Sequence, residues 1–110
     1  MEIISGKVIG KVQNIMFRQT LIRGLIKRSL VGGATNHKEN GDQVTFTISG
    51  DPSLIIELIE DLESGKKLNS WGAQVKSLEK FEHVIPIEDH EVTTENVDQI
   101  KWSTGVEFYL

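Results

Sequence analysis

The dipeptide Asn40-Gly41 constrains the fold more than any other short feature of this chain, because it strongly favours a β-hairpin. Both central residues of a type I′ turn need a positive φ, which Gly and Asn adopt more readily than other residues. We therefore expect residues 34–39 and 43–49 to form two antiparallel strands joined at this turn. In the second strand, alternation predicts an inward face of Val44, Phe46 and Ile48 and an outward face of Thr45 and Thr47.

Two helices are predicted, one on each side of the hairpin. The first runs from about Gln19 to Leu30 and ends before Gly32-Gly33, because apolar residues recur there with helical spacing. The second begins at Asp51-Pro52, since Asp can cap free N–H groups and Pro lacks one, and it ends at Gly65. The apolar stripes consist of Leu21, Ile22, Leu25, Ile26 and Leu30 in the first helix and Leu54, Ile55, Leu58, Ile59 and Leu62 in the second.

Three more segments, 4–12, 73–81 and 100–110, are predicted to be strands. Apolar residues in the segment 73–81 are spaced by three rather than two, so we expect a β-bulge there. Residues 83–99 contain many acidic side chains and little periodicity, and we expect mostly loop. The last strand is expected to place Trp102, Thr104, Val106 and Phe108 on one face.

The resulting order is strand, helix, strand, strand, helix, strand and one further strand. It predicts an α+β protein with the ferredoxin-like βαββαβ sandwich, in which two helices cover one face of an antiparallel sheet and a C-terminal strand is added at the edge. A chain of 110 residues is the size of one domain, so we expect residues 1–110 to form a single domain. Because unrelated enzymes and binding modules share this fold, the topology assigns no function by itself.

Composition restricts the classes of function. The chain has no apolar run near the ~20 residues that span a bilayer, so we expect no membrane partner. No basic and apolar leader precedes the first strand, so we expect no signal peptide. Cysteine is absent, which excludes disulfides, thiolate metal sites and cysteine nucleophiles. These features suit a cytoplasmic protein, which we expect to be a monomer.

Charge is divided unevenly along the chain. Residues 1–40 carry seven basic and two acidic side chains, whereas residues 41–110 carry five basic and fourteen acidic ones. A basic half can bind nucleic acid or attract a small anionic substrate. We favour the small anion, because the few aromatic residues are not interleaved with basic ones as a single-strand stacking surface requires. Nucleic-acid binding on the sheet face is the least favoured alternative.

The segment Gly10–Arg18 is the candidate anion site. Alternation ends at Val12 and helical spacing begins by Gln19, which predicts a strand end, a tight loop and a helix entrance. Backbone N–H groups at a helix entrance lack partners, the helix dipole adds partial positive charge, and Arg18 can offer a planar fork of donors to phosphate oxygens. By residue type alone, the favoured interpretation of Arg18 is a solvated side chain at a helix start.

This segment resembles the signature loop of the acylphosphatases, whose usual form is Val-Gln-Gly-any-any-Phe-Arg. Here it reads Val12-Gln13-Asn14-Ile15-Met16-Phe17-Arg18, with Asn14 in the place of a glycine. A second family feature is Gly-any-any-any-Asn ahead of a glycine turn, and residues 32–36 match it. The resemblance covers about residues 3–82, and residues 105–108 are similar to the family's last strand.

The resemblance implies hydrolysis of acyl phosphates, the mixed anhydrides of a carboxylate and phosphate, with no metal or other cofactor. It implies that Arg18 and Asn36 are catalytic: Arg18 clamps two phosphate oxygens, and Asn36 holds a water in line with the leaving carboxylate. The substrate-binding residues are expected to be Gln13, Asn14, Ile15, Met16, Phe17 and Arg18.

Asn14 is where the sequence and the family pattern differ. We expect Asn14 to adopt a positive φ, because Asn does so more readily than other residues with a β-carbon. The substitution is also the best support for an alternative function, a non-catalytic module that binds an anion or a partner on the same fold. No metal site is predicted, because His37, His83 and His90 lack the spacing of zinc ligands, and each is expected at the surface.

Overall fold

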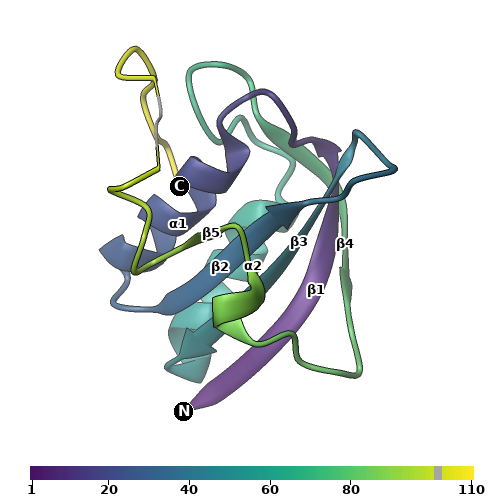
Figure 1. Cartoon of the computed structure of the whole chain (residues 1–110), viewed down its shortest axis with the longest axis vertical. Helices are drawn as coiled ribbons and strands as arrows, with labels where there is room; N and C mark the ends of the chain where they lie inside the picture. Colours follow the sequence, from purple (N-terminus) through teal and green to yellow (C-terminus); the bar gives the residue numbers. More distant parts are fainter. Residues whose placement is uncertain (101–102) are drawn as a thin grey trace.

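A computed structural model describes residues 1–100 and 103–110, which fold into an α-helical layer packed on a β-sheet (Figure 1). No helix within these residues is long and apolar enough to cross a membrane. In chain order, the described elements are β1 (Glu2–Lys11), α1 (Phe17–Lys27), β2 (Val31–Asn36), β3 (Gln43–Gly50), α2 (Pro52–Glu63), β4 (Gln74–Lys80), the 3-10 helix η1 (Ile87–Asp89) and β5 (Val92–Thr93).

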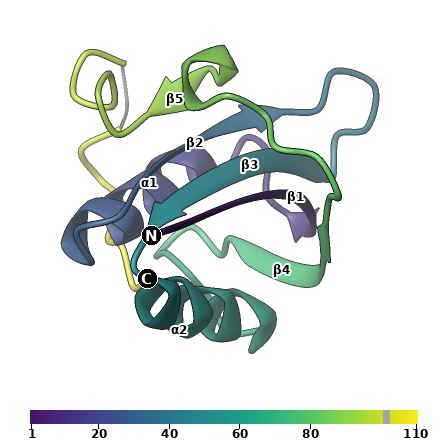
Figure 2. The same ribbon diagram turned by 90° about the horizontal axis from the view of Figure 1, so that it is seen from below.

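The strands form one antiparallel sheet in the order β4-β1-β3-β2-β5. Both α-helices lie on the same face of this sheet, as the view in Figure 2 shows. The predicted ferredoxin-like arrangement with an added edge strand is therefore confirmed. The predicted bulge is also present, because the pairing of β1 with β4 shifts register at Ile9 and Gly10 and leaves Lys76 as the extra residue.

The core lies between the sheet and the two helices. Val44, Phe46 and Ile48 of β3 point into it and are fully buried, as their alternation predicted. Five buried residues on the helices face them, Leu21, Ile22 and Leu25 from α1 and Leu58 and Leu62 from α2.

The predicted start of α2 at Asp51 is confirmed, whereas α1 does not end at the glycines that were predicted to stop it. Asp51 accepts a hydrogen bond from Ser53 N at 2.8 Å, which satisfies one of the free N–H groups at the start of α2. Helix α1 ends at Lys27, and Ser29 takes the left-handed conformation (φ 58°) that glycine usually adopts after a helix. The prediction that Gly32-Gly33 stops the helix was wrong, since both glycines lie inside β2.

The hairpin between β2 and β3 is present, but its turn differs from the predicted type I′. Neither Asn40 nor Gly41 has a positive φ, and the strands are joined by a longer loop over residues 37–42. His37 Nδ1 accepts hydrogen bonds from the N–H groups of Glu39 and Asn40 at 3.2 and 3.1 Å. The His37 side chain therefore supplies hydrogen-bond partners for backbone groups of this loop, and a tight turn is not required for that.

A segment of residues 82–93 crosses the sheet face opposite the helices (Figure 2). His90 is buried there against Thr47 and Thr35, so the expectation that His90 lies at the surface was wrong. Thr47 lies on the outward face of β3, as predicted, but this segment covers it. His90 can pack this closely on β2 because residue 33 is a glycine: a Cβ at that position would lie 2.6 Å from His90 Cβ. Thr47, on the polar outer face of β3, is thus covered by chain that the sequence predicted to be loop.

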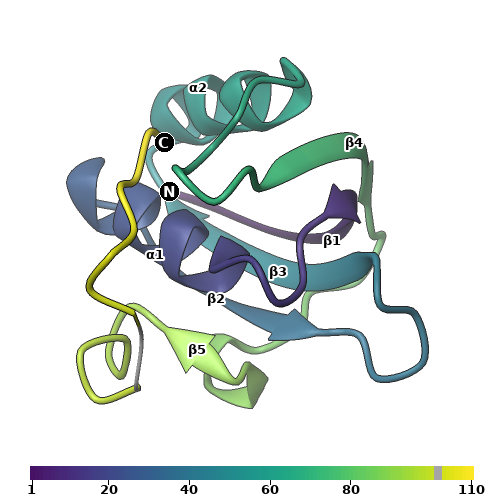
Figure 3. The ribbon, with the colours of Figure 1, turned by 90° about the horizontal axis from the view of Figure 1, so that it is seen from above.

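The fifth strand is β5, at Val92–Thr93, and not the predicted segment 100–110. It pairs with Gly33 and Ala34 of β2. Residues 103–110 instead run beside α1 in the helical layer, as Figure 3 shows. Phe108 makes an isolated bridge to Asn69, and Leu110 packs against Gly24 of α1. Trp102, which was expected on the last strand, lies outside the described residues.

Candidate active site

The loop between β1 and α1 contains two residues with left-handed backbone conformations. Asn14 has a φ of 59°, so the predicted positive φ is confirmed, and Met16 has a φ of 62° that the sequence did not predict. Such conformations turn backbone N–H groups toward one side and create concave sites that attract anions. For a residue with a side chain they cost of order 1 kcal/mol or more, and such strain persists where the surrounding structure enforces it.

The start of α1 lies at the end of this loop. Met16 is its N-cap residue and makes no side-chain capping bond, and the first turn of α1 contains no acidic residue. The first N–H groups of a helix have no partner within the helix, and the helix dipole places partial positive charge beside them. An anion at this position would receive backbone hydrogen bonds without competition from a capping side chain.

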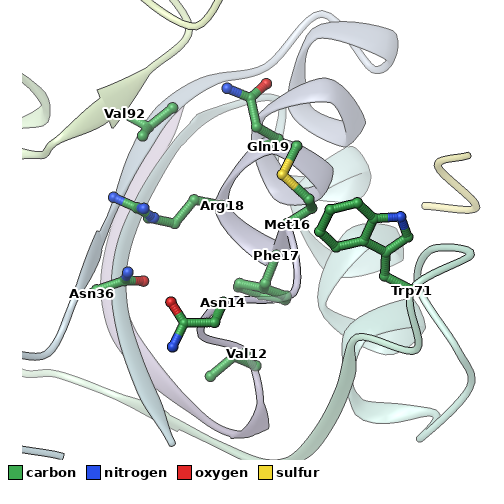
Figure 4. Close-up of a pocket in the computed structure, with 9 residues that line it drawn as sticks. All are labelled: Val12, Asn14, Met16, Phe17, Arg18, Gln19, Asn36, Trp71 and Val92. Atoms are coloured by element: carbon green, nitrogen blue, oxygen red, sulfur yellow. The ribbon is translucent and has the colours of Figure 1, made fainter. Parts of the chain in front are cut away.

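A pocket of about 250 Å³ lies over the loop and the start of α1. Figure 4 shows its two sides: the polar ends of Arg18, Asn36 and Asn14 gather near β2, and Trp71 lies on the opposite side, with Met16 nearer to it. One part of the pocket can thus bind a charged group and the other an apolar group. The lining residues are Val12, Asn14, Met16, Phe17, Arg18, Gln19, Asn36, Trp71 and Val92.

The two predicted catalytic residues meet at one oxygen atom. Glu91 Oε1 accepts hydrogen bonds from Arg18 Nη1 and from the backbone N of Asn36, each at 3.0 Å. Arg18 comes from the first turn of α1 and Asn36 from the last residue of β2. The structure therefore brings these residues, which are distant in sequence, to the same pocket.

Asn36 Oδ1 is buried, and no described residue donates a hydrogen bond to it. A buried acceptor without a partner is costly, so such an atom commonly marks a place for a water or a ligand. Asn36 lines the pocket, but Oδ1 has almost no accessible surface, so a molecule bound there can donate to this oxygen only after the side chain rotates.

Gln13 and Ile15 belong to the loop, but their side chains do not line the pocket. Gln13 Nε2 donates to three carbonyls of the β2–β3 loop and its end, those of His37, Asn40 and Gln43, at 3.0, 2.9 and 2.8 Å. Ile15 packs against the core. These two residues can contact a substrate only through their backbone, whereas the side chains of Asn14, Met16, Phe17 and Arg18 line the pocket.

Trp71 was not predicted from the sequence as a site residue, and its loop is fixed by Asn69. The Asn69 side chain is fully buried; its Nδ2 donates to Ile15 O and Thr20 Oγ1, and its Oδ1 accepts from Trp71 N and Ala73 N. Asn69 thus ties the candidate phosphate loop and α1 to the loop that carries Trp71. The bonds to Ile15 and Thr20 join segments about half the chain apart, so nothing local in residues 66–72 signals that link.

The buried His90 anchors the segment that carries Glu91. Its Nδ1 lies 2.9 Å from Thr35 Oγ1 and its Nε2 lies 2.8 Å from Thr47 Oγ1. A neutral ring that donates from Nε2 and accepts at Nδ1 satisfies both hydroxyls, because Thr47 Oγ1 in turn donates to Ile85 O. Burial lowers the pKa of His90 below its usual value of 6.5, and the nearby Asp89 carboxylate opposes this to a smaller extent.

Within the part of the chain that the structure describes, no three His, Cys, Asp or Glu side chains group together as metal ligands. His83 lies at the surface as expected and stacks on Phe81, with ring centroids 5.1 Å apart.

Comparison with known proteins places the chain beside one family. The family model Acylphosphatase matches residues 4–93. A search of curated proteins gave no match. The crystal structure of acylphosphatase from Bacillus subtilis is similar with a TM-score of 0.62 and 21% identity, over 74% of this chain and 83% of that one. The structure of an acylphosphatase from Coxiella burnetii is similar with a TM-score of 0.58 and 27% identity, over 81% of this chain and 85% of that one.

Proposed function

The chain belongs to the acylphosphatase family, and on this premise we propose that it hydrolyses acyl phosphates by in-line attack of water on a phosphoryl group. The products are a carboxylate and inorganic phosphate. In the proposed mechanism Arg18 and the amides of the loop bind the phosphoryl group, and Asn36 holds the water. The buried Oδ1 of Asn36, which has no donor among the described residues, is the observation that carries the proposal.

Phosphate binding in this mechanism depends on preorganised donors. The loop at residues 13–18 and the uncapped start of α1 offer N–H groups, and Arg18 offers a guanidinium at the same pocket. Phosphoryl transfer needs positioning and neutralisation of charge on the equatorial oxygens more than it needs covalent chemistry. Arg18 supplies positive charge where a metal ion acts in other phosphoryl-transfer enzymes, so we propose that the reaction is metal-independent.

Asn36 orients the nucleophile. A water that donates to Asn36 Oδ1 turns a lone pair away from that oxygen and toward the phosphorus of a phosphoryl group held by Arg18. A carboxylate is a good leaving group, so a neutral amide that orients the water can suffice without a strong general base. The proton released by the water passes to the phosphate product, which balances the reaction.

The acyl part of the substrate lies, in this proposal, on the side of the pocket formed by Trp71 and Met16. Trp71 is 44% exposed, so its ring is available to an apolar or aromatic group that enters from solvent. The phosphoryl group and the acyl group would then be recognised by opposite walls. We further propose that the enzyme acts as a cytoplasmic monomer on small molecules and not on nucleic acid; size-exclusion chromatography tests the monomer.

Hydrolysis of benzoyl phosphate, followed by its loss of absorbance, tests the proposal. The parent should be active with and without a chelator. Arg18→Lys should lower kcat/KM by about 100-fold or more, because a point charge cannot replace a planar fork of donors. Arg23→Lys is the matched control, because Arg23 lies on the same helix and does not line the pocket.

Asn36→Ala separates orientation of water from binding. Turnover should fall by about 100-fold or more, while inhibition by inorganic phosphate stays within about twofold of the parent. Equal losses in turnover and phosphate affinity would instead make Asn36 a binding residue. A parent that binds phosphate and does not hydrolyse acyl phosphates would support the non-catalytic module.

A further inference from the structure

We propose that Glu91 is a positioning residue that holds the Arg18 guanidinium at the pocket, an inference that rests on the proposed function of Arg18. Glu91 Oε1 accepts from Arg18 Nη1 and from Asn36 N, both at 3.0 Å. One carboxylate oxygen therefore fixes the distance between the phosphate ligand and the strand end that carries the water-orienting amide.

The backbone of Glu91 is itself held in place on both sides. Its N–H donates to Thr35 Oγ1 at 3.0 Å, and its carbonyl accepts from Asn96 Nδ2 at 3.2 Å. The preceding His90 is buried, and the following Val92 pairs with Ala34 of β2. The carboxylate is thus presented from a fixed point on the sheet, although half of the side chain is exposed to solvent.

Arg18 needs such a partner because a long side chain has many rotamers in solution. Within the described residues, Glu91 is the only group that accepts a hydrogen bond from the Arg18 side chain. Glu91 uses one of the five N–H donors of the guanidinium and leaves the others for phosphate oxygens. It contacts Arg18 without lining the pocket, so it orients the donor and does not occupy the anion site.

The carboxylate also has an opposing effect, because a negative charge beside Arg18 weakens the attraction for an anion. Two substitutions separate the effects. Glu91→Gln removes the charge and keeps an oxygen that accepts from Arg18 and Asn36. Glu91→Ala removes both, so a difference between Gln and Ala isolates positioning at constant charge.

The experiment measures kcat and KM for benzoyl phosphate and, by calorimetry, the affinity for inorganic phosphate in both variants. We expect Glu91→Gln to exceed Glu91→Ala by about tenfold in kcat and in phosphate affinity, since displacing a catalytic group by about 1 Å can cost more than this. Asp98→Asn and Asp98→Ala are the matched controls, because Asp98 pairs with Arg23 of α1 at 2.8 Å and does not line the pocket. These controls should not differ in either quantity.

The outcomes are distinct. If Glu91→Gln and Glu91→Ala have the same kcat and the same phosphate affinity, Glu91 does not position Arg18. If in addition kcat in both variants is far below that of the parent, Glu91 acts as a proton acceptor instead. If the parent does not hydrolyse benzoyl phosphate, but Glu91→Gln still binds phosphate more tightly than Glu91→Ala, the hydrolytic function is refuted and the positioning role is supported. A parent that neither hydrolyses benzoyl phosphate nor binds phosphate would refute both. Circular dichroism melts establish that each variant is folded.

Discussion

Gln13 provides a test of how the proposed phosphate loop is joined to the strand that carries Asn36. Its side-chain amide donates toward the carbonyls of His37, Asn40 and Gln43, all within 3.0 Å. The amide has two hydrogens for three acceptors, so one hydrogen is shared. Two of these bonds are partly buried and one is exposed, and a typical bond contributes about 1 kcal/mol net.

Gln13→Ala should therefore lower the free energy of unfolding by about 2 kcal/mol. For a domain of this size that corresponds to a fall in Tm of about 8 °C, measured by thermal denaturation followed by circular dichroism. Gln13→Glu should cost more, although it has nearly the same shape, because carboxylate oxygens would face three carbonyl oxygens. Acidification should return part of this loss, since a protonated Glu regains one donor.

The matched control is Gln99→Glu, which makes the same change of charge at an exposed residue. It should leave Tm within about 2 °C of the parent. If Gln13→Glu also melts within that range at neutral pH, the three contacts contribute nothing and the reasoning is refuted. A loss in Gln13→Ala that equals the loss in Gln13→Glu would show that shape matters more than the donors.

Two further outcomes are expected. Asn14→Gly should keep or improve activity because glycine adopts the observed φ of 59° freely, whereas Asn14→Val should lose phosphate binding and stay folded; unaltered phosphate binding in Asn14→Val, measured by calorimetry, would contradict this. Because burial lowers the pKa of His90 in the folded state, the unfolded state binds more protons as pH falls below about 6.5. The contribution of neutral His90 to the free energy of unfolding should therefore be fully present above that pH and be lost as pH falls toward the folded-state pKa. Urea denaturation of the parent and His90→Gln at pH 8 and pH 5 should show this loss in the parent alone.

The parts of the fold that the sequence predicted depend on neighbouring residues. The cap at Asp51 and the alternation in β3 are set by a few adjacent positions, and so is the positive φ at Asn14. The pairing of β2 with β3 could be predicted for the same reason. The prediction of a type I′ turn was wrong because Gln13, far from the turn in sequence, donates hydrogen bonds to carbonyls of the loop.

The parts that were missed depend on contacts between distant segments. Arg18 and Glu91 are separated by 73 positions, and Glu91 lies in an acidic segment without periodicity. A strand of two residues such as β5 has too few positions to show alternation. The alternation near the C-terminus was misleading, because Val106 and Leu110 are buried without belonging to the sheet.

Asn69 has a consequence for how this pocket can diversify. Its side chain holds the backbone at Trp71 and at Ile15 through separate atoms, Oδ1 and Nδ2. The side chain at position 71 takes no part in those bonds, and its ring N–H reaches only Gly105 O at 3.4 Å. Replacing Trp71 should therefore reshape the apolar side of the pocket, while the proposed anion-binding side keeps its geometry. Under the proposed function, substitutions at position 71 would then change the preference for acyl groups and leave phosphate binding unaltered.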